Sequence, residues 1–178
     1  RNSGLKNVLV TNGYINAEPA ATLLEVIDAA NVDLKTFSET FYRNEIKGSR
    51  DPVLQFIRMA AASVHLEVTT LVIPDRTDSY SEIEKIAQFL GGINPDIPLH
   101  LSCYYPTYRY TIPATSPEQV FRLVEVAKRH LNYVYPGNVG RREVDTLCPY
   151  CSSLLVSRHG YLVRVLGLKD GMCTTCGT

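Results

Sequence analysis

The sequence has no excess of charge of either sign and no long apolar run. Its 18 lysines and arginines balance 18 aspartates and glutamates, and its basic clusters are small, as at Arg141-Arg142. Such a chain lacks the positive field that draws proteins to nucleic acids or anionic membranes, so neither partner is expected. No apolar run approaches the length of a membrane span, and no signal peptide opens the chain. We therefore expect a cytoplasmic protein.

Cysteine is scarce outside two short motifs. Four of the five cysteines form two Cys-x-x-Cys pairs, and Cys103 stands alone. This pattern is typical of metal binding in a reducing compartment rather than of a secreted disulfide framework. We expect Cys103 to be a small buried hydrophobic residue. The chain also lacks an initiator methionine, which indicates processing, tag removal or a chain that is part of a larger protein.

Length and element order indicate one main α/β core with a small appendage. A chain of 178 residues, 45% of them hydrophobic, can bury one sizeable core. Strand-like and helix-like segments alternate up to about residue 135, which predicts parallel strands covered by helices. The predicted strands are Asn7–Thr11, Asn31–Lys35, His65–Ile73, Pro98–Cys103 and Asn132–Tyr135. The predicted helices run from Glu18 to about Ala30, over Ser38–Ile46, from Asp51 onward, from Ser79 to Gly91 and from Ser116 to about His130.

Local start signals support three of these helices. Asp51-Pro52 combines a capping residue with a proline in the first turn, where the missing N–H is harmless. Ser79 followed by Glu82, and Ser116 followed by Gln119, have the spacing of a capping box. In that motif each side chain bonds the backbone N–H of the other residue.

The stretch Asn31–Lys35 places an acid and a base on one side of a predicted strand. Strand side chains alternate, so Asn31, Asp33 and Lys35 share one face and the two apolar residues between them occupy the other. Both faces of a parallel sheet are normally buried, and an unpaired buried charge costs roughly several kcal/mol. Asp33 and Lys35 therefore form either an internal ion pair or part of a polar pocket.

Polar residues also follow the ends of the other predicted strands. The carboxyl ends of parallel strands meet at one edge of a sheet, and ligands bind at that edge. We expect the two histidines near strand starts, His65 and His100, to lie away from it. The residues at or near the strand ends are Thr11-Asn12-Gly13, Asp33, Lys35, Thr69, Thr70, Cys103 and Tyr105.

From Asp145 onward the sequence has the pattern of a metal-binding ribbon. Four thiolates on two short turns suit a tetrahedral Zn²⁺ or a single iron ion. With four protein ligands such a site is closed and structural, and the metal holds together a segment too small for a core of its own. Neither pair opens a helix, so a thioredoxin-like redox role is not expected. The candidate ligands are Cys148, Cys151, Cys173 and Cys176, which flank two β-rich arms, Leu154–Arg158 and Tyr161–Leu166.

Six stretches, which together cover nearly the whole chain in order, carry a family resemblance. They are Val10-Thr11-Asn12-Gly13-Tyr14, Asn31–Lys35, Val68–Pro74, Ser102–Pro106, Val134–Val139 and the terminal cysteine ribbon. At these residues the chain resembles radical S-adenosylmethionine enzymes, specifically the AmmeMemoRadiSam-system relatives of pyruvate formate-lyase activating enzyme. The resemblance implies a partial (βα) barrel of parallel strands, an incomplete TIM-like half-barrel, over residues 1–140. A small zinc-ribbon-like appendage with four cysteine ligands would follow at 145–178.

The resemblance also implies a ligand and the residues that bind it. In the family, S-adenosylmethionine lies across the carboxyl ends of the strands. Asp33 and Lys35 would contact the polar ends of this ligand, and Asn12 and Thr69, with the adjacent threonine, would line the same cleft. Tyr105 would border it at a position where relatives often carry histidine, and a phenol cannot replace an imidazole in every hydrogen bond.

Two segments of the family pattern are absent from this sequence. They are the Cys-x-x-x-Cys-x-x-Cys motif, which holds a 4Fe-4S cluster, and the glycine-rich segment that binds the methionine amino group. Both normally lie upstream, so the chain is expected to be the C-terminal part of such an enzyme and inert on its own. The parent enzyme would reductively cleave S-adenosylmethionine and abstract hydrogen from a substrate, for example a glycyl radical enzyme.

Two further expectations concern partners. The alternative to an enzyme is a binding module, in which a cluster-less α/β scaffold presents the zinc ribbon to a protein or RNA. Arg158, His159 and Arg164 on the ribbon would then be binding residues instead of a solvated face. The predicted strand Asn7–Thr11 has an unpaired edge if the first units are missing, which predicts a dimer or aggregation.

Overall fold

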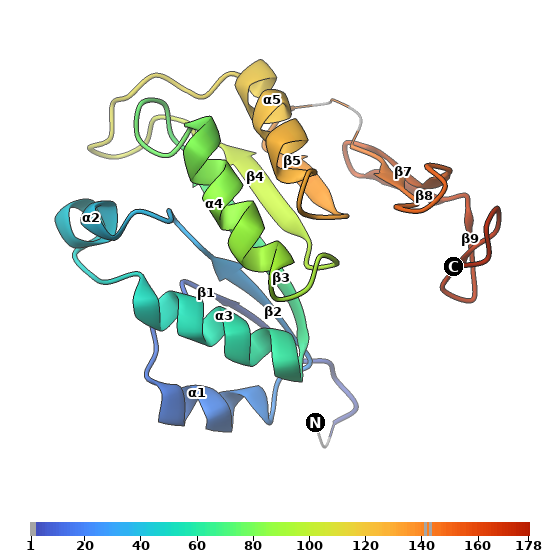
Figure 1. The fold of residues 1–178 in the computed structure, drawn as a ribbon, viewed down its shortest axis with the longest axis horizontal. Helices are drawn as coiled ribbons and strands as arrows, with labels where there is room; N and C mark the ends of the chain where they lie inside the picture. The colour runs from blue at the N-terminus through green and yellow to red at the C-terminus, as the bar shows by residue number, and fades with distance from the viewer. Residues whose placement is uncertain (1–2, 141, 143) are drawn as a thin grey trace. The chain divides into compact units, whose positions relative to one another are not determined.

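The computed structural model describes residues 3–140, 142 and 144–178. The chain divides into two compact units, Arg1–Gly137 and Asn138–Thr178 (Figure 1). Within the described ranges, no helix is both long enough and apolar enough to cross a membrane.

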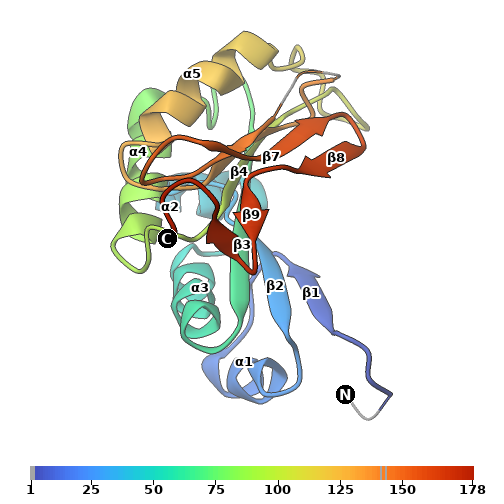
Figure 2. The same cartoon turned by 90° about the vertical axis from the view of Figure 1, so that its right-hand side faces the viewer.

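The first unit is built on a five-stranded parallel sheet whose spatial order, β1-β2-β3-β4-β5, follows the chain. The strands are β1 (Val8–Thr11), β2 (Ala29–Asp33), β3 (His65–Val72), β4 (Leu99–Cys103) and β5 (Val134–Gly137). The helices are α1 (Ala17–Leu24), α2 (Glu39–Phe41), α3 (Asp51–Ser63), α4 (Tyr80–Gly91) and α5 (Pro117–Ala127), with a π-helix η1 (Tyr42–Ile46) after α2. Figure 2 shows β1 at the edge of this sheet, beside β2. The sheet does not close on itself within the described residues, so the predicted α/β half-barrel is confirmed.

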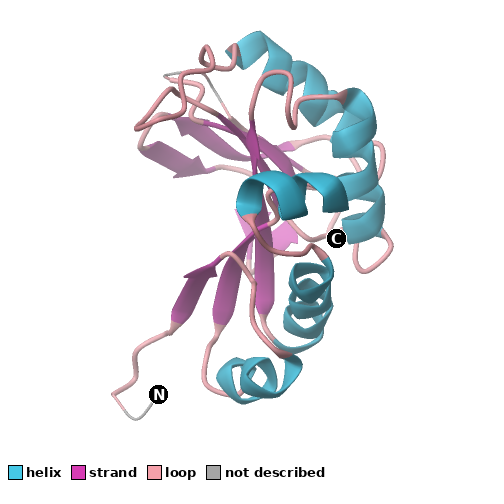
Figure 3. Cartoon of the chain, turned by 90° about the vertical axis from the view of Figure 1, so that its left-hand side faces the viewer, coloured by secondary structure: helices cyan, strands magenta, loops and turns pink. Residues whose placement is uncertain are grey.

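The two faces of this sheet differ in burial. The long helices lie along one face (Figure 3), and the strand residues directed toward them, such as Val32, Val68 and Leu101, are buried. Each such aliphatic side chain contributes about 1.5–3 kcal/mol by leaving water. Most of the strand residues that alternate with these buried ones, and so point to the other face, are partly or fully exposed. That second face is therefore not covered by helices as the first is. We call it the open face, and its residues are Val8, Val10, Asn31, Asp33, Glu67, Thr69, Leu71, His100, Ser102 and Tyr135.

The boundary between α1 and β2 differs from the sequence prediction. Helix α1 ends at Leu24 instead of near Ala30, because Ala29 and Ala30 join β2. Alanine favours helices, but both residues pair with β1 in the parallel ladder, so sheet pairing overrides local propensity. At its other end β2 stops at Asp33, which leaves Lys35 just beyond the last paired residue.

Helices α4 and α5 begin at the predicted caps. The Ser79 and Ser116 hydroxyls each accept a hydrogen bond from the backbone N–H three residues further on. The capping box at Ser79 also predicts a bond from the Ser79 N–H to the Glu82 side chain, but Glu82 makes a tertiary contact in its place. The Glu82 carboxylate accepts hydrogen bonds from the Thr36 hydroxyl and the Phe37 N–H, which ties α4 to the loop after β2.

The second unit is a small β structure around the motif cysteines. The strands β6 (Thr146–Leu147), β7 (Leu154–His159) and β8 (Leu162–Val165) form one antiparallel sheet. The strands β9 (Leu168–Lys169) and β10 (Met172–Cys173) form another. Its buried cluster consists of two of the cysteines with Leu155 and Val156. This core is small for a unit of this length, so something other than apolar burial must hold it together.

Candidate functional site

Asp33 and Lys35 lie side by side where β2 ends. The Lys35 ammonium donates to the Asp33 carboxylate with an Nζ–Oδ2 distance of 2.6 Å. The side chains remain 34% exposed for Asp33 and 40% exposed for Lys35. The ion pair predicted as one alternative is therefore present, and both charges are also within reach of a ligand. An exposed pair of this kind adds only about 0–1 kcal/mol to stability, so a ligand could replace it at little cost.

The backbone that carries Lys35 is held by side chains from three other elements. The Leu34 carbonyl accepts a hydrogen bond from the Thr70 hydroxyl of β3 at 2.8 Å. The Lys35 N–H donates to the Tyr42 hydroxyl of η1 at 3.3 Å, and Glu82 of α4 bonds the next two residues. Because the Leu34 carbonyl, the Lys35 N–H and the Phe37 N–H are bonded beyond the end of the strand, the acid and the base are presented from a fixed support.

Tyr42 owes its place to the π-helix. In η1 the Lys47 N–H donates to the Tyr42 carbonyl, and Lys47 then ends the helix in the left-handed region with φ 63°. The Tyr42 side chain is buried, and this burial, opposed by the hydrogen bond from the Lys35 N–H, raises the pKa of Tyr42 to about 12. The phenol is therefore neutral at physiological pH. The sequence predicted only a helical stretch here, and no local pattern reveals the π-turn, a feature that is frequent at functional sites.

Thr69 and Thr70 have different environments, although the prediction placed both in one cleft. Thr69 pairs with Asp33 across the sheet, and its hydroxyl donates to the Asn31 side chain at 3.0 Å on the open face. Thr70 points to the opposite, helix-covered face, where it is fully buried and serves the backbone of Leu34. Thr69 therefore stays a candidate binding residue, and Thr70 is a structural one.

Asn12 and Tyr105 each follow the end of a strand, as predicted. Asn12 comes directly after β1, and its side-chain oxygen accepts a hydrogen bond from the Tyr14 N–H at 3.0 Å, which closes a turn. Tyr105 follows β4 and is 53% exposed. Cys103, at the end of β4, is buried as expected.

Strand register places four polar or aromatic side chains in one row on the open face. Asp33 is paired with Thr69, Thr69 with His100, and His100 with Tyr135. The His100 ring stacks on Tyr135 with centroids 5.5 Å apart, and its Nε2 lies 2.9 Å from Glu67 Oε2. The sequence prediction set His100 apart from the candidate binding residues, because it is near the start of its strand. The stagger between strands, which local sequence does not reveal, brings it beside Thr69.

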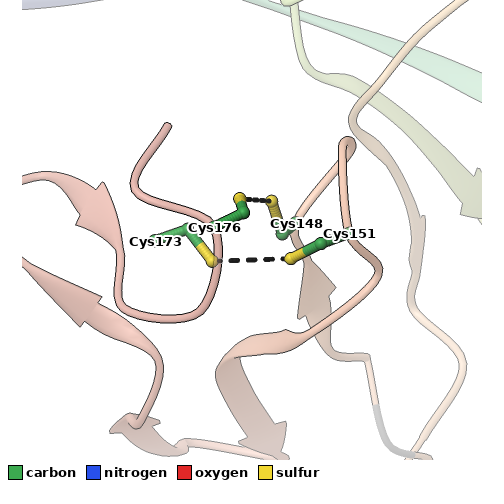
Figure 4. A group of neighbouring side chains, drawn as sticks. All are labelled: Cys148, Cys151, Cys173 and Cys176. Atoms are coloured by element: carbon green, nitrogen blue, oxygen red, sulfur yellow. Dashed lines mark hydrogen bonds between the residues drawn. The ribbon is translucent and has the colours of Figure 1, made fainter.

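The four motif cysteines converge in the second unit (Figure 4). Their Sγ atoms all lie within 4.8 Å of one another, with Cys148 and Cys176 at 3.6 Å and Cys151 and Cys173 at 3.7 Å. Four thiolates around one tetrahedral Zn²⁺ at about 2.3 Å are about 3.8 Å apart. The donor set therefore fits a metal ion, and the four ligands leave no open position for a substrate.

Both cysteine pairs are shaped by the same turn. In the first pair the Ser152 N–H donates to the Cys148 carbonyl at 2.9 Å, and in the second the Gly177 N–H donates to the Cys173 carbonyl at 2.8 Å. Ser152 and Gly177 have φ of 60° and 77°, so each turn closes through the left-handed region. The turns aim the two thiols of each pair in one direction.

Hydrogen bonds in the second turn favour thiolates, the form that binds metal. Hydrogen bonds from the Thr178 hydroxyl and backbone lower the pKa of the Cys176 thiol to about 6. Bonds from the backbone of Cys176 and Thr175 lower the pKa of Cys173 as well. Less proton competition at these two ligands strengthens metal binding near neutral pH.

Comparison with known proteins gives one curated relative for nearly the whole chain. It is the uncharacterized protein MJ0808 of Methanocaldococcus jannaschii, which is 34% identical over 184 residues, covering 99% of this chain and 54% of the relative. The chain thus spans about half the length of this relative. No protein-family model matches the chain.

Solved structures identify the fold. A domain of pyruvate-formate lyase-activating enzyme from Bacteroides vulgatus has a TM-score of 0.65 at 18% identity, covering 77% of this chain and 84% of that domain. Streptococcus suis SuiB bound to S-adenosylmethionine has a TM-score of 0.60 at 14% identity, covering 75% and 33%. Archaeal TYW1 has a TM-score of 0.54 at 14% identity, covering 75% and 43%. The chain shares the α/β fold of these structures, an open parallel sheet of five strands with helices along one face.

The residues of this chain do not fit the 4Fe-4S cluster that the sequence resemblance implies for the parent enzyme. That cluster needs three cysteines in the spacing Cys-x-x-x-Cys-x-x-Cys, which the sequence lacks. Four of its cysteines belong to the ribbon, and Cys103 is single and buried. The candidate chemistry of the first unit is therefore binding.

Proposed function

We propose that this chain is part of a radical S-adenosylmethionine enzyme of the activating-enzyme type, of the AmmeMemoRadiSam group. Its own contribution is to bind S-adenosylmethionine where β2 ends. The observation that carries the proposal is the Asp33–Lys35 pair, which is partly exposed where β2 ends and is followed by a backbone bonded from three elements. A ligand that carries both a positive and a negative charge can replace the Asp33–Lys35 ion pair with one bond to each of the two side chains.

The chemistry of the ligand matches the two side chains. S-adenosylmethionine carries an ammonium and a carboxylate on its methionine part and hydroxyls on its ribose. Lys35 would donate to the carboxylate or a ribose hydroxyl, and Asp33 would accept from the ammonium or a hydroxyl. Thr69, in register with Asp33, would offer its hydroxyl oxygen as a neutral acceptor, and Asn12 and Tyr105 would border the ligand.

Calorimetric titration of the full chain with S-adenosylmethionine tests this proposal. We expect Asp33→Asn and Lys35→Met each to weaken binding about tenfold or more, because a hydrogen bond to a charged group is worth about 1.5–3 kcal/mol. Lys6→Met is the matched control, since it breaks a comparable ion pair with Asp28, at 3.2 Å, before β1 and β2 begin. Equal loss in the control, or no binding by the unsubstituted chain, would refute the assignment.

The metal of the ribbon is proposed to be Zn²⁺ in a structural role. The support is the closed set of four thiolates with near-tetrahedral spacing. Elemental analysis of protein purified without added metal should find one zinc per chain. Iron at the same stoichiometry, with the colour of an iron–thiolate centre, would contradict it.

A non-catalytic binding module is the second candidate, and one observation favours it. All of β8 is exposed, with Leu162, Val163 and Val165 each more than half exposed, and Tyr161 before it is fully exposed. A ribbon that presents these residues has a surface for a protein or RNA partner. Salt-dependent RNA binding would support this function, and its absence at low salt would count against an RNA partner.

A further inference from the structure

Strand β8 forms the free edge of the antiparallel sheet in the second unit. It pairs with β7 on one side (Figure 2), and no strand of the described residues pairs with its other side. Five of the six residues from Tyr161 to Leu166 are aliphatic or aromatic, and each of these five is more than half exposed. The sixth is Arg164. An exposed apolar strand edge of this kind is a template for pairing with a further strand.

The register with β7 shows which backbone groups of β8 are directed outward. In an antiparallel pair, residues that exchange hydrogen bonds with the neighbouring strand alternate with residues whose N–H and C=O point away from it. The Leu166 N–H donates to the Leu155 carbonyl at 2.9 Å, so Leu166 bonds inward, toward β7. By alternation Arg164 does the same. The backbone N–H and C=O of Val163 and Val165 therefore point outward, along the free edge.

A second copy of β8 can pair with this edge about a two-fold axis. Residues that lie opposite each other in such a pair point to the same face of the joined sheet. Two registers then use the outward groups of Val163. In one, Val163 lies opposite Val163 of the second copy, and Arg164 lies opposite Leu162. In the other, Arg164 lies directly opposite Arg164, and like charges in that position destabilise a sheet, so the first register is favoured.

We propose that this chain forms a two-fold symmetric dimer in which β8 pairs with β8 of a second copy, centred on Val163. The β6-β7-β8 sheets of the two copies then join into one sheet. The two Val163 side chains meet at the axis. Tyr161 of each copy comes alongside Val165 of the other, which adds an aromatic–β-branched pair of the kind that stabilises sheets.

The size and charge of this surface fit a weak dimer. The exposed parts of the five apolar side chains offer roughly 500 Å² per copy, less than the about 800 Å² that each partner buries in a standard interface. Self-association should therefore depend on concentration. Arg164 is the single charged residue from Tyr161 to Leu166, so the surface lacks the positive field that an RNA partner requires. It also differs from the β1 edge, which belongs to the parallel sheet of the first unit.

Sedimentation velocity of the full chain at increasing protein concentration tests the proposal. Every sample carries Val10→Lys, so that the β1 edge contributes little. Val163→Lys and Val163→Glu should each weaken self-association about tenfold, because they place like charges opposite each other at the axis. An equal mixture of the two should regain the dimer, because opposite charges then face each other. Met172→Lys, at another exposed side chain of the second unit, is the matched control and should associate like the Val10→Lys chain.

Arg164→Glu tests the register. In the proposed pairing this residue faces Leu162, so a mixture of Arg164→Glu with the Val10→Lys chain should associate no more than about twofold more tightly than either alone. A much tighter mixture would mean that Arg164 faces Arg164 and would overturn the pairing centred on Val163.

Three other outcomes also overturn the proposal. They are a Val10→Lys chain that stays monomeric at every concentration, a Val163 variant that associates as tightly as that chain, and a mixture that fails to recover what the two Val163 variants lose. Mixing cannot repair a folding defect, so recovery shows a direct contact between the two copies. The samples contain neither S-adenosylmethionine nor RNA, so the result does not depend on the functions proposed above.

Discussion

Removing the ribbon metal should unfold residues 138–178 and leave the parallel sheet intact. The buried cluster of this unit contains only two aliphatic side chains, Leu155 and Val156, besides its cysteines. Their burial is worth about 1.5–3 kcal/mol each. A structural Zn²⁺ contributes about 10–16 kcal/mol in comparable peptides. The metal therefore outweighs the apolar core of the unit, and no other contact on this scale replaces it among the residues that the structure describes.

Nuclear magnetic resonance of ¹⁵N-labelled protein, before and after a strong chelator in the presence of a reductant, measures this effect. The amide signals of β7 and β8 should collapse into the narrow range of an unfolded chain, and those of β2, β3 and β4 should keep their positions. The four ribbon thiols should become reactive at the same time. Signals of β7 and β8 that stay dispersed after all four thiols are free would show that the core suffices without metal.

A cysteine substitution separates the metal from general damage to the protein. Cys148→Ser removes one of the four converging ligands and should abolish stoichiometric zinc binding. Cys103→Ser places a comparable change in the buried end of β4, far from any ligand in sequence, and should leave one zinc per chain. Equal zinc loss in both variants would mean that the metal content follows overall stability instead of the ribbon ligands.

Three further predictions test the first unit. The pKa of Tyr42 is raised to about 12 from about 10 in an unfolded chain, so stability should fall as pH rises between these values, and Tyr42→Phe should remove that part of the alkaline transition followed by circular dichroism. Gly13 has φ 67°, and an added Cβ would lie 2.9 Å from Val32 Cγ1, so Gly13→Ala should cost about 2–4 kcal/mol in urea unfolding. Gly4→Ala, with φ 71° and open space around it, should cost less than half of that. The β1 edge should cause concentration-dependent self-association by light scattering, and Val10→Lys, at a side chain that is 75% exposed, should reduce it.

The fold could be predicted from the sequence because its signals are local. Ser79 and Ser116 cap the helices that they were expected to cap, and the strand–helix alternation carries through to β5. The boundary at Ala29 and Ala30 could not be predicted, because helix propensity and sheet pairing disagree there and pairing depends on a distant strand.

The supports of the candidate site could not be predicted for a related reason. Glu82 has the spacing of a capping box, yet its carboxylate bonds the loop after β2, which is distant in sequence. From the sequence, Tyr42 is one more residue of a weakly predicted helix. In the structure it begins a π-helix, and its hydroxyl accepts a hydrogen bond from the Lys35 N–H. The sequence predicts that His100 lies away from the candidate binding residues, because it is near the start of its strand. Its pairing with Thr69 depends on how β3 and β4 are aligned, which the sequence does not reveal.

The alternation of polar and apolar residues within a strand–helix sequence is itself informative. A parallel sheet covered on both faces has strands that are apolar throughout. Here the burial of β3 alternates strictly: Leu66, Val68, Thr70 and Val72 are buried under the helices, and Glu67, Thr69 and Leu71 lie on the open face. Polar side chains at a period of two leave one face of the sheet without an apolar partner. Parallel order with one partly polar, open face is therefore compatible with a half-barrel whose inner surface meets a polar ligand, and this is the physical basis for proposing the ion pair at the end of β2 as a binding group.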